Sequence, residues 1–298
     1  MQYHQLGTSN LLVSEIAFGG MSLSGSDEDN VKLLQHAVGQ GVNFFDTADL
    51  YDKGHNETLF GKAFKDRRDE VVLATKVGNQ WRADGTGWDW NPRKEYIIQA
   101  VEDSLRRLQT DYIDLYQLHG GTIDDPMDEI IGAFEKLQHD GKIRYYGISS
   151  IRPNVIRAYV ERSNIDSVMM QYSLLDRRPE ESMFALLEYH QVSVLARGSV
   201  AKGLLAGKPI MGYLEYTDDQ VQEMADLVAA HSSDRRTAGQ TAIRYALQHP
   251  AVTSAVVGIR TEQQLQEAIG VSAAPELTAA EMLRMANTLP ANRYADHR

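Results

Sequence analysis

Short apolar segments recur along the chain, and each is followed by a longer segment in which apolar residues return every three or four positions. The short segments are typical of buried strands, and the longer ones are typical of helices with one apolar face. The first such pair is Ile16–Gly19 and a predicted helix over Asp27–Gln40, which Gly41 ends. The pattern repeats eight times, with strands predicted over residues 16–19, 42–46, 71–76, 114–119, 143–150, 166–171, 192–196 and 253–257.

Other sequence signals complete the predicted architecture. Prolines at positions 92, 126 and 153 are typical of helix starts, and another helix is predicted over residues 55–64. Residues 3–6 and 12–14 flank a turn and predict an N-terminal β-hairpin, and a short helix is expected after Leu277. Eight strand–helix repeats predict an α/β fold of the (β/α)8 TIM-barrel type. No Gly-x-Gly-x-x-Gly turn follows the first strand, and no linker divides the chain, so residues 1–298 are predicted to form one domain.

Three of the predicted strands end in ionisable residues, which are Asp46, Lys76 and His119. An unpaired buried charge costs several kcal/mol, so a core strand has no structural reason to end in this way. In a barrel of this type, the carboxyl ends of the strands and the loops after them form the active-site face. We therefore expect Asp46, Lys76 and His119 to lie side by side there, with Tyr51 in the loop just beyond Asp46.

These residue types suit the protonation of an oxygen on which negative charge develops. An isolated phenol has a pKa of about 10, but a neighbouring ammonium stabilises the phenolate, and a carboxylate keeps that ammonium charged. A histidine can orient a carbonyl or relay a proton. A metal site formed by Asp46, Asp49 and His119 is the alternative, and it is disfavoured because Lys76 would lie against the cation. No metal is therefore expected.

Composition narrows the class of protein further. There are no cysteines, which excludes disulfides and thiol catalysis and fits a cytoplasmic protein. The formal net charge of -11 argues against nucleic acid or an anionic membrane as a partner. The first residues lack the features of a signal peptide, and no apolar run approaches the roughly 18 residues that a membrane span needs.

At these motifs the chain resembles the aldo-keto reductases. The shared features are the segment from Leu6 to Met21, the Asp-Thr-Ala-x-x-Tyr…Asn-Glu block from Asp46 to Glu57, Ala-Thr-Lys at Lys76 and Leu-His at His119. The resemblance covers almost the whole chain. It implies a TIM barrel that reduces aldehydes and some ketones by direct hydride transfer from NADPH. It also implies a tetrad of Asp46, Tyr51, Lys76 and His119, with Tyr51 as the general acid.

The same resemblance implies a set of cofactor-binding residues. Ser149, with Ser150 where an asparagine is usual, and Gln171 would hold the nicotinamide carboxamide, and the segment from Lys202 to Lys208 would fold over the pyrophosphate. Thr261 and Gln264 have the spacing of a capping box and predict a helix start with free N–H groups, and the resemblance implies that Arg260 at this helix start would bind the 2′-phosphate. The implied cofactor-binding residues are Gly20, Met21, Ser149, Ser150, Gln171, Arg197, Gly198, Ser199, Val200, Lys202, Gly203, Leu204, Lys208, Gly258, Ile259, Arg260 and Gln264.

Some positions depart from the family pattern. Arg197-Gly198-Ser199-Val200 replaces a segment that often carries an aromatic stacked on the nicotinamide, so either Arg197 or a nearby ring such as Tyr172 would take that place. Val257 replaces a common proline, and Ala268 replaces an asparagine that often binds adenine.

The loop after Lys76 carries all three tryptophans, Trp81, Trp88 and Trp90, and is interpreted either as a packed lid or, preferably, as a substrate wall. Trp81 and Trp88 are the predicted substrate-binding residues. The short loop from Gly120 to Pro126 suggests an open pocket for a small carbonyl compound. Two other hypotheses remain, a regulatory protein that binds NADPH with little turnover and a metal-dependent barrel hydrolase or isomerase. The sequence does not predict the oligomeric state.

Overall fold

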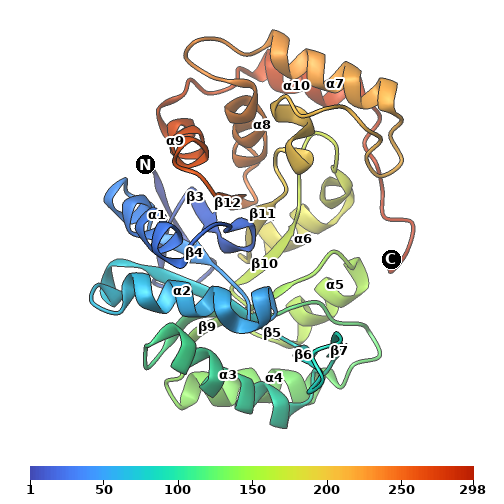
Figure 1. Cartoon of the computed structure of the whole chain (residues 1–298). Helices are drawn as coiled ribbons and strands as arrows, with labels where there is room; N and C mark the ends of the chain where they lie inside the picture. Colours follow the sequence, from blue (N-terminus) through green and yellow to red (C-terminus); the bar gives the residue numbers. More distant parts are fainter.

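A closed barrel of eight parallel strands occupies the centre of the protein (Figure 1). The structure is a computed structural model that describes all residues from Met1 to Arg298. The predicted (β/α)8 fold is therefore confirmed. Around the barrel the strands follow in the order β10 (Ser167–Gln171), β11 (Ser193–Arg197), β12 (Val252–Gly258), β3 (Ile16–Gly19), β4 (Phe44–Asp46), β5 (Val72–Val77), β8 (Ile113–Leu118) and β9 (Ile143–Ser149).

Helices surround the barrel and cover its outer face (Figure 1). Side-chain caps begin several of them: Ser26 accepts a hydrogen bond from the N–H of Asp29, and capping boxes start the helices after Thr217, Thr237 and Thr278. The α-helices are α1 (Asp27–Gly39), α2 (His55–Phe64), α3 (Lys94–Leu108), α4 (Met127–His139), α5 (Pro153–Arg162), α6 (Met183–Tyr189), α7 (Asp218–Ala230), α8 (Ala238–Leu247), α9 (Glu262–Gly270) and α10 (Ala279–Thr288).

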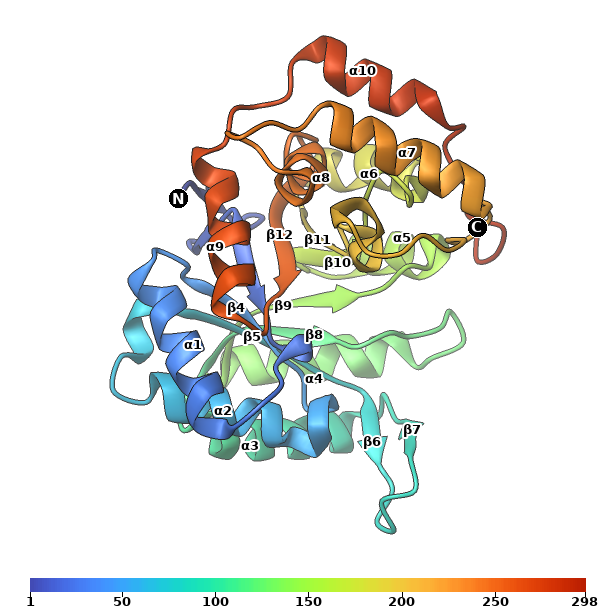
Figure 2. The same cartoon turned by 45° about the horizontal axis from the view of Figure 1, so that its top comes forward.

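Two hairpins and several 3-10 turns are added to this frame. The predicted N-terminal hairpin pairs β1 (Tyr3–Gln5) with β2 (Leu12–Ser14), and its residues Leu6, Leu11 and Val13 pack into the apolar interior of the barrel. A second hairpin extends from the barrel after β5 (Figure 2). Its strands are β6 (Asn79–Trp81) and β7 (Trp88–Trp90), and the 3-10 turns are η1 (Gly20–Ser22), η2 (Tyr51–Gly54), η3 (Arg68–Glu70), η4 (Arg178–Glu181), η5 (Ala201–Ala206) and η6 (Val271–Ala273).

The barrel strands alternate between two apolar clusters. Inward-facing residues such as Phe44, Ala74, Leu115 and Leu195 form a small cluster inside the barrel, whereas a much larger cluster lies between the strands and the helices. Because side chains alternate along a strand, the residue two positions after each inward one also points into the barrel. The next inward layer toward the carboxyl ends is Gly19, Asp46, Lys76, Gln117, Gly147, Gln171, Arg197 and Gly258. The apolar interior therefore ends in a polar layer.

Element boundaries differ from the sequence predictions at a few points. The helix expected to open at Pro92 begins at Lys94, because Arg93 is still extended and precedes the first helical residue. The long loop expected after Lys76 instead contains the hairpin β6–β7, in which Trp81 pairs with Trp88. Residue alternation is short and broken by Gly85 and Gly87 in this segment, so the pattern gave no strand signal.

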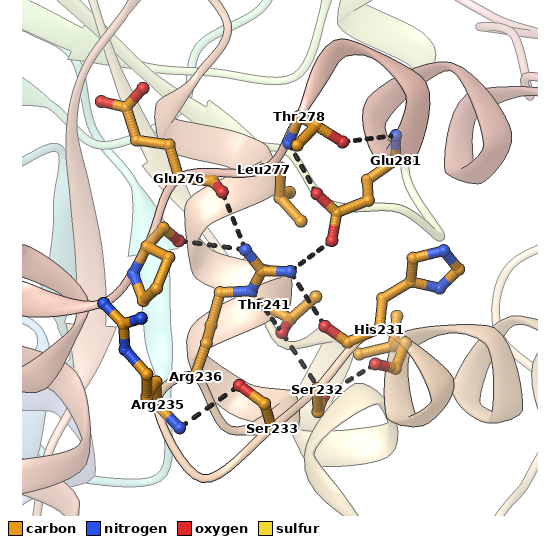
Figure 3. A network of polar contacts seen from close by, with 12 residues as sticks. His231, Ser232, Ser233, Arg235, Arg236, Thr241, Glu276, Leu277, Thr278 and Glu281 are labelled. Atoms are coloured by element: carbon orange, nitrogen blue, oxygen red, sulfur yellow. Dashed lines mark hydrogen bonds and ion pairs between the residues drawn. The ribbon is translucent and has the colours of Figure 1, made fainter.

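The expected C-terminal helix is α10, and a buried arginine fastens it to the body of the protein (Figure 3). Arg236 donates hydrogen bonds to the carbonyl oxygens of Pro275, Glu276 and His231, to Thr241 Oγ1 and to Glu281. Glu281 belongs to the first turn of α10, where it also completes the capping box with Thr278. Every nitrogen of this guanidinium is thus used, and together they join the segment between α7 and α8 to the start of α10.

Candidate active site

Asp46, Tyr51, Lys76 and His119 come together at the carboxyl end of the barrel. Asp46 is the last residue of β4, Lys76 lies one residue before the end of β5, and His119 directly follows β8. These three strands are neighbours in the barrel, with Asp46 level with Ala74 and Lys76 level with Gln117. Tyr51 begins η2, and its ring lies edge-on to the His119 ring at 5.8 Å between centroids. The structure therefore brings the four predicted side chains into one group.

The Lys76 ammonium is the centre of this group. Its Nζ atom donates to Asp46 Oδ2 at 2.7 Å, to the Thr47 carbonyl at 2.7 Å and to the Tyr51 hydroxyl at 3.3 Å. An ammonium has three N–H donors, so each donor has one partner and the group has a single favourable orientation. Lys76 is fully buried, which shields the contact with Tyr51 from water. The arrangement aims one positive charge at the Tyr51 oxygen.

The charge states of Lys76 and Asp46 are set by their burial and by their mutual attraction. Burial tends to lower the pKa of Lys76, but the Asp46 carboxylate and Tyr51 outweigh it and hold that pKa above its ordinary value. Burial also raises the pKa of Asp46, against the pull of Lys76. Lys76 consequently remains an ammonium at neutral pH, which is what stabilisation of a phenolate requires.

His119 is neutral in this environment. Burial, together with the positive charges of Lys76 and Arg197, lowers the pKa of His119 to about 3. Its Nδ1 atom is buried and makes no hydrogen bond within the chain, while Asn79 Nδ2 donates to its backbone oxygen at 3.3 Å. A neutral imidazole has one donor and one acceptor nitrogen, so His119 can offer a hydrogen bond to a bound molecule without carrying charge.

The loop that carries Tyr51 has an unusual backbone. Asp52 and Lys53 both adopt the left-handed conformation, with φ of 49° and 54°, which is uncommon for residues other than glycine. Contacts from the β6–β7 hairpin hold this turn in place. Trp81 Nε1 donates to the Leu50 carbonyl at 3.2 Å, and Lys53 Nζ lies 5.2 Å from the centre of the Trp81 ring. These contacts from the hairpin therefore stabilise the turn that contains Tyr51.

Trp88 and Trp90 differ from Trp81 in their surroundings. Trp90 donates its indole N–H to Asp125 at 3.0 Å, and its ring covers Gly78, where an added Cβ would approach within 2.4 Å. Trp88 is 47% exposed on the outer strand of the hairpin. The three rings thus do not form one packed lid: two are anchored by their N–H groups and the third faces solvent.

Gln117 belongs to the group but was not among the predicted site residues. It is level with Lys76 in the neighbouring strand, points into the barrel and is fully buried. Neither its amide nitrogen nor its amide oxygen has a well-formed hydrogen bond in the chain, and the same is true of Asp46 Oδ1. Its position two residues before His119, on the same side of β8, was the available sequence signal. Buried polar atoms without partners are uncommon in folded proteins and call for an explanation.

A second set of buried polar residues supports the group from behind. Thr47 Oγ1 donates to Asn56 Oδ1 at 2.6 Å, and Asn56 Nδ2 donates to the Gly20 carbonyl at 2.9 Å. Glu57 accepts from Thr75 Oγ1 at 2.6 Å and from Arg107 Nε at 2.6 Å. These bonds fix α2 against β3, β4 and β5 at the level of Lys76.

The residues predicted to hold a carboxamide lie at neighbouring strand ends. Ser149 ends β9 and Gln171 ends β10. Gln171 Oε1 has only a long contact, 3.5 Å from Arg178 Nη2. The Ser150 hydroxyl instead accepts a hydrogen bond from the Arg152 N–H at 3.2 Å within its own loop. Ser149 and Gln171 therefore have polar groups available to a ligand at this edge. The Ser150 hydroxyl, in contrast, is engaged with the backbone of its own loop.

The segment after β11 forms a compact turn. Gly198, Ala201, Lys202, Gly203 and Gly207 all have positive φ angles. The Lys208 side chain lies across Gly203, where an added Cβ would come within 2.7 Å of it. The buried Ser199 hydroxyl has no hydrogen-bond partner. A close-fitting backbone with a lysine and an unused hydroxyl suits a phosphorylated ligand such as a dinucleotide.

The predicted phosphate position at the start of α9 has the expected charge and a modified cap. Thr261 Oγ1 accepts from the Gln264 N–H at 3.2 Å, as predicted, but the Gln264 side chain accepts from the N–H of Arg260 and not of Thr261. The helix begins at Glu262, whose carboxylate is held 2.8 Å from His36 Nδ1. The Arg260 guanidinium is exposed and has no partner in the chain. It is available to an anion at this helix start.

Other predicted cofactor residues surround these positions. Gly20 and Met21 form η1 directly after β3, and an added Cβ at Gly20 would come within 2.6 Å of the Phe60 ring. Met21 is 70% exposed. Val200 directly precedes η5 and Leu204 lies within it, while Gly258 ends β12 and Ile259 connects it to Arg260. All of them lie at the carboxyl ends of the strands, the same edge as Lys76.

Tyr172, one of the two alternatives that the sequence left open, does not offer a ring to this edge. Its side chain packs between the barrel and the helices, with its ring 4.8 Å from the Phe184 ring, and its hydroxyl donates to Glu180 at 2.9 Å. Strand alternation explains the difference, because Gln171 points into the barrel and the next residue must point outward. Arg197 is then the remaining candidate of the two.

No three His, Asp or Glu side chains converge in an arrangement that could hold a metal ion. No helix combines the length and apolar character that crossing a membrane would require.

Known proteins share both the sequence and the fold of this chain. The sequence profile described as "Aldo/keto reductase family" matches residues 15–289. The "Uncharacterized oxidoreductase YqkF" of Bacillus subtilis is 47% identical over 307 aligned positions that span all of both chains. The "Aldo-keto reductase YhdN" of the same organism is 33% identical over 74% of this chain and 68% of the relative.

Solved structures agree with the sequence comparison. The holo form of the aldo-keto reductase AKR11C1 from Bacillus halodurans matches with a TM-score of 0.95 and 50% identity, over 100% of this chain and 99% of that one. Its apo form matches with a TM-score of 0.86 and 46% identity over the same shares of the two chains. The chain therefore belongs to the aldo/keto reductase family, oxidoreductases that act on small carbonyl compounds with nicotinamide cofactors.

Proposed function

We propose that this protein reduces aldehydes and some ketones to alcohols with NADPH, and that Tyr51 is the general acid. The observation that carries the proposal is the contact of the Tyr51 hydroxyl with the Lys76 ammonium, whose other two donors are taken by Asp46 and Thr47. A phenol beside a fixed buried cation is a proton donor whose conjugate base is stabilised. Family membership supplies the reaction class.

The residues divide the chemistry as follows. A bound NADPH supplies a hydride, which is transferred to the carbonyl carbon. As negative charge develops on the carbonyl oxygen, the Tyr51 hydroxyl gives its proton to that oxygen, and Lys76 stabilises the phenolate that remains. Neutral His119 donates a hydrogen bond that orients the carbonyl oxygen, and water returns a proton to Tyr51 afterwards. Asp46 does not contact the substrate and keeps Lys76 charged and in place.

The cofactor residues are proposed on the fit of their free groups. Ser149 and Gln171 hold the carboxamide, while the turn from Gly198 to Lys208 covers the pyrophosphate with Ser199 and Lys208 as polar contacts. Arg260 and the first N–H groups of α9 bind the 2′-phosphate, with Gln264 beside them. Because the Arg260 guanidinium has no other partner, we propose that NADPH is preferred over NADH.

The substrate is proposed to enter beside the β6–β7 hairpin. The indole N–H of Trp81 is used by the Leu50 carbonyl, so its ring supplies an apolar surface next to Tyr51. Trp88, exposed on the same hairpin, forms the outer part of this wall. The loop from Gly120 to Pro126 is short, which leaves room for small carbonyl compounds of varied shape.

The proton-donor role is tested with Tyr51→Phe, which removes only the hydroxyl. We expect kcat for a reactive aromatic aldehyde to fall by about two to four orders of magnitude. The Kd for NADPH, measured by fluorescence titration, should stay within about twofold, because the hydroxyl is a catalytic and not a cofactor-binding group. Tyr189→Phe, at an 84% exposed tyrosine, is the matched control and should change neither value. Retained turnover in Tyr51→Phe would overturn the assignment.

The 2′-phosphate assignment is tested with Arg260→Ala. We expect the KM for NADPH to rise about tenfold, because one charge-assisted contact to phosphate is lost. The KM for NADH should not change, since NADH has no phosphate at this position. Arg284→Ala at the exposed Arg284 of α10 controls for the change in net charge. An equal rise for both cofactors would show that Arg260 does not read the phosphate.

A further inference from the structure

Arg197 is a cation in the polar layer at the mouth of the barrel. It ends β11, level with Gln171 on one neighbouring strand and Val256 on the other. Leu195, two residues earlier, belongs to the apolar cluster inside the barrel, so Arg197 also points inward. The following Gly198 faces open space, because an added Cβ there would meet no atom within 4 Å. The Arg197 side chain therefore borders a space above the barrel interior.

The guanidinium of Arg197 also has no partner within the chain. It is half-buried, yet none of its nitrogens makes a hydrogen bond or ion pair within the chain. The buried Arg236, in contrast, uses all three of its nitrogens (Figure 3). Arg178, on the neighbouring η4, is paired with Asp176 at 2.7 Å. An arginine that enters a site and leaves five donors unused is available to a bound molecule.

Nearby groups show where the charge of Arg197 acts. Its positive charge contributes to the lowered pKa of His119 and opposes the burial that raises the pKa of Asp46. Both residues belong to the group around Lys76, across the barrel mouth from β11. Tyr172, the other candidate for the place beside the nicotinamide, is packed outside the barrel. Of the two candidates, Arg197 is therefore the side chain that lies at the barrel mouth, on the β11 side and opposite the group around Lys76.

We propose that Arg197 faces the nicotinamide ring and makes the site bind NADPH in preference to NADP⁺. The inference rests on the proposed function and adds the basis of selection between the two redox forms. The oxidised ring carries a positive charge and the reduced ring is neutral, so the guanidinium repels only the oxidised form. Two unit charges at contact distance repel enough to lower affinity about fivefold in bulk water, and more where water is excluded.

This repulsion has a consequence for the direction of the reaction. It weakens the binding of the oxidised product after each hydride transfer, and it leaves the binding of the reduced cofactor unaffected. Release of product often limits the turnover of enzymes that close over their ligands. Arg197 thus favours reduction of a carbonyl over oxidation of an alcohol, and it does so without contacting the carbonyl group.

The test compares the Kd values of both redox forms by calorimetry or fluorescence titration. We expect wild type to bind NADPH more tightly than NADP⁺, by a ratio of about fivefold or more. Arg197→Met should reduce that ratio about fivefold, mainly by tightening NADP⁺, whereas Arg197→Lys keeps the charge and should keep most of the ratio. Arg284→Met, at an exposed arginine remote from the barrel mouth, should leave the ratio unchanged. A circular-dichroism melt of each variant checks that it is folded.

Other outcomes would overturn the proposal. If Arg197→Met leaves the ratio unchanged, the guanidinium does not face the ring. If it instead raises only the KM for an aldehyde that bears a carboxylate, relative to a neutral aldehyde of equal length, then Arg197 recognises an anionic substrate and the proposal is wrong. Failure of the proposed function is distinguishable, because wild type would then neither bind NADPH nor oxidise it in the presence of an aldehyde.

Discussion

Two buried aspartates, Asp46 and Asp114, are held by cations at opposite ends of the barrel strands, and their surroundings differ. Asp114 lies near the start of β8, where Oδ2 accepts from Arg68 Nη2 at 2.6 Å and from the Leu73 N–H, and Oδ1 accepts from Arg144 Nη1 at 2.9 Å. Asp46 lies at the end of β4, where Oδ2 accepts from Lys76 at 2.7 Å and Oδ1 has no well-formed hydrogen bond. Both oxygens of the Asp114 carboxylate thus accept hydrogen bonds, whereas only one oxygen of Asp46 does.

The same contrast extends to the residues around each aspartate. At the same end of the barrel as Asp46, buried polar atoms of Gln117, His119 and Ser199 also lack partners. Near Asp114, both oxygens and both arginines are engaged in a closed set of bonds. An unpaired buried polar group costs about 1–3 kcal/mol, so the carboxyl end of the barrel is less stable than the chain could make it. This difference indicates that the amino end serves folding and the carboxyl end serves binding and chemistry.

The largest expected effects come from replacing each aspartate by asparagine. Asp114→Asn removes the charge that two arginines share and should lower the free energy of unfolding by about 3 kcal/mol, with kcat unchanged. Asp46→Asn removes the counter-charge of Lys76 and should lower kcat by about a hundredfold or more. Because Lys76 would also lose its buried counter-charge, Asp46→Asn should lower stability as well, and the loss of activity is what distinguishes the two variants. Urea unfolding and steady-state kinetics measure the two effects.

Each variant is the control for the other, because Asp114→Asn and Asp46→Asn each remove one buried negative charge. If both variants lose stability equally and both keep their activity, the two ends of the barrel do not differ as we infer. If Asp114→Asn loses activity while it remains folded, the amino end also takes part in the chemistry.

A smaller effect is expected from the pH dependence of stability at His119. Its pKa is lowered from 6.5 to about 3 in the folded protein, so below pH 6.5 the unfolded chain takes up a proton that the folded protein does not. Stability from this residue is therefore complete above the unfolded pKa and is lost as pH falls toward 3. Relative to pH 7.5, wild type at pH 5 should lose about 1–2 kcal/mol more than His119→Gln. Thermal unfolding at both pH values measures the difference, and parallel losses would contradict the buried neutral state.

The smallest effect is expected at Asp166, near the amino end of β10. Burial raises its pKa to about 6, against the hydrogen bond from Thr8 Oγ1 at 3.4 Å. The folded protein thus holds a proton that the unfolded chain releases near pH 3.8, and stability from this residue is present at low pH and lost as pH rises through 6. The full shift from 3.8 to about 6 corresponds to about 3 kcal/mol, and solvent screening reduces the net effect, so Asp166→Asn should gain about 1 kcal/mol at pH 7.5 and little at pH 4. Asp124→Asn, at an exposed carboxylate, controls for the charge change, and a gain at pH 4 would contradict the mechanism.

The periodicity of the chain was sufficient to predict the barrel, because each strand is a short apolar run and each helix shows its own spacing. Strand-terminal charges at Asp46, Lys76 and His119 were visible for the same reason, since a polar residue at the end of an apolar run is conspicuous. The role of Gln117 could not be predicted in this way. A glutamine within an apolar strand only interrupts the hydrophobic pattern, and the sequence does not show that its side chain points into the barrel. The β6–β7 hairpin was missed because Gly85 and Gly87 break the residue alternation in this segment.

The sequence by itself thus determined the order of strands and helices, the charged ends of the strands and the resemblance that gives the reaction class. The tertiary structure decided what depends on direction and distance. Closure of the barrel made Asp46, Lys76 and Gln117 neighbours, alternation along β10 turned Tyr172 outward, and the same alternation along β11 turned Arg197 inward. The physical reason is that a side chain's partners are set by the register between strands, and residues far apart in the chain fix that register together.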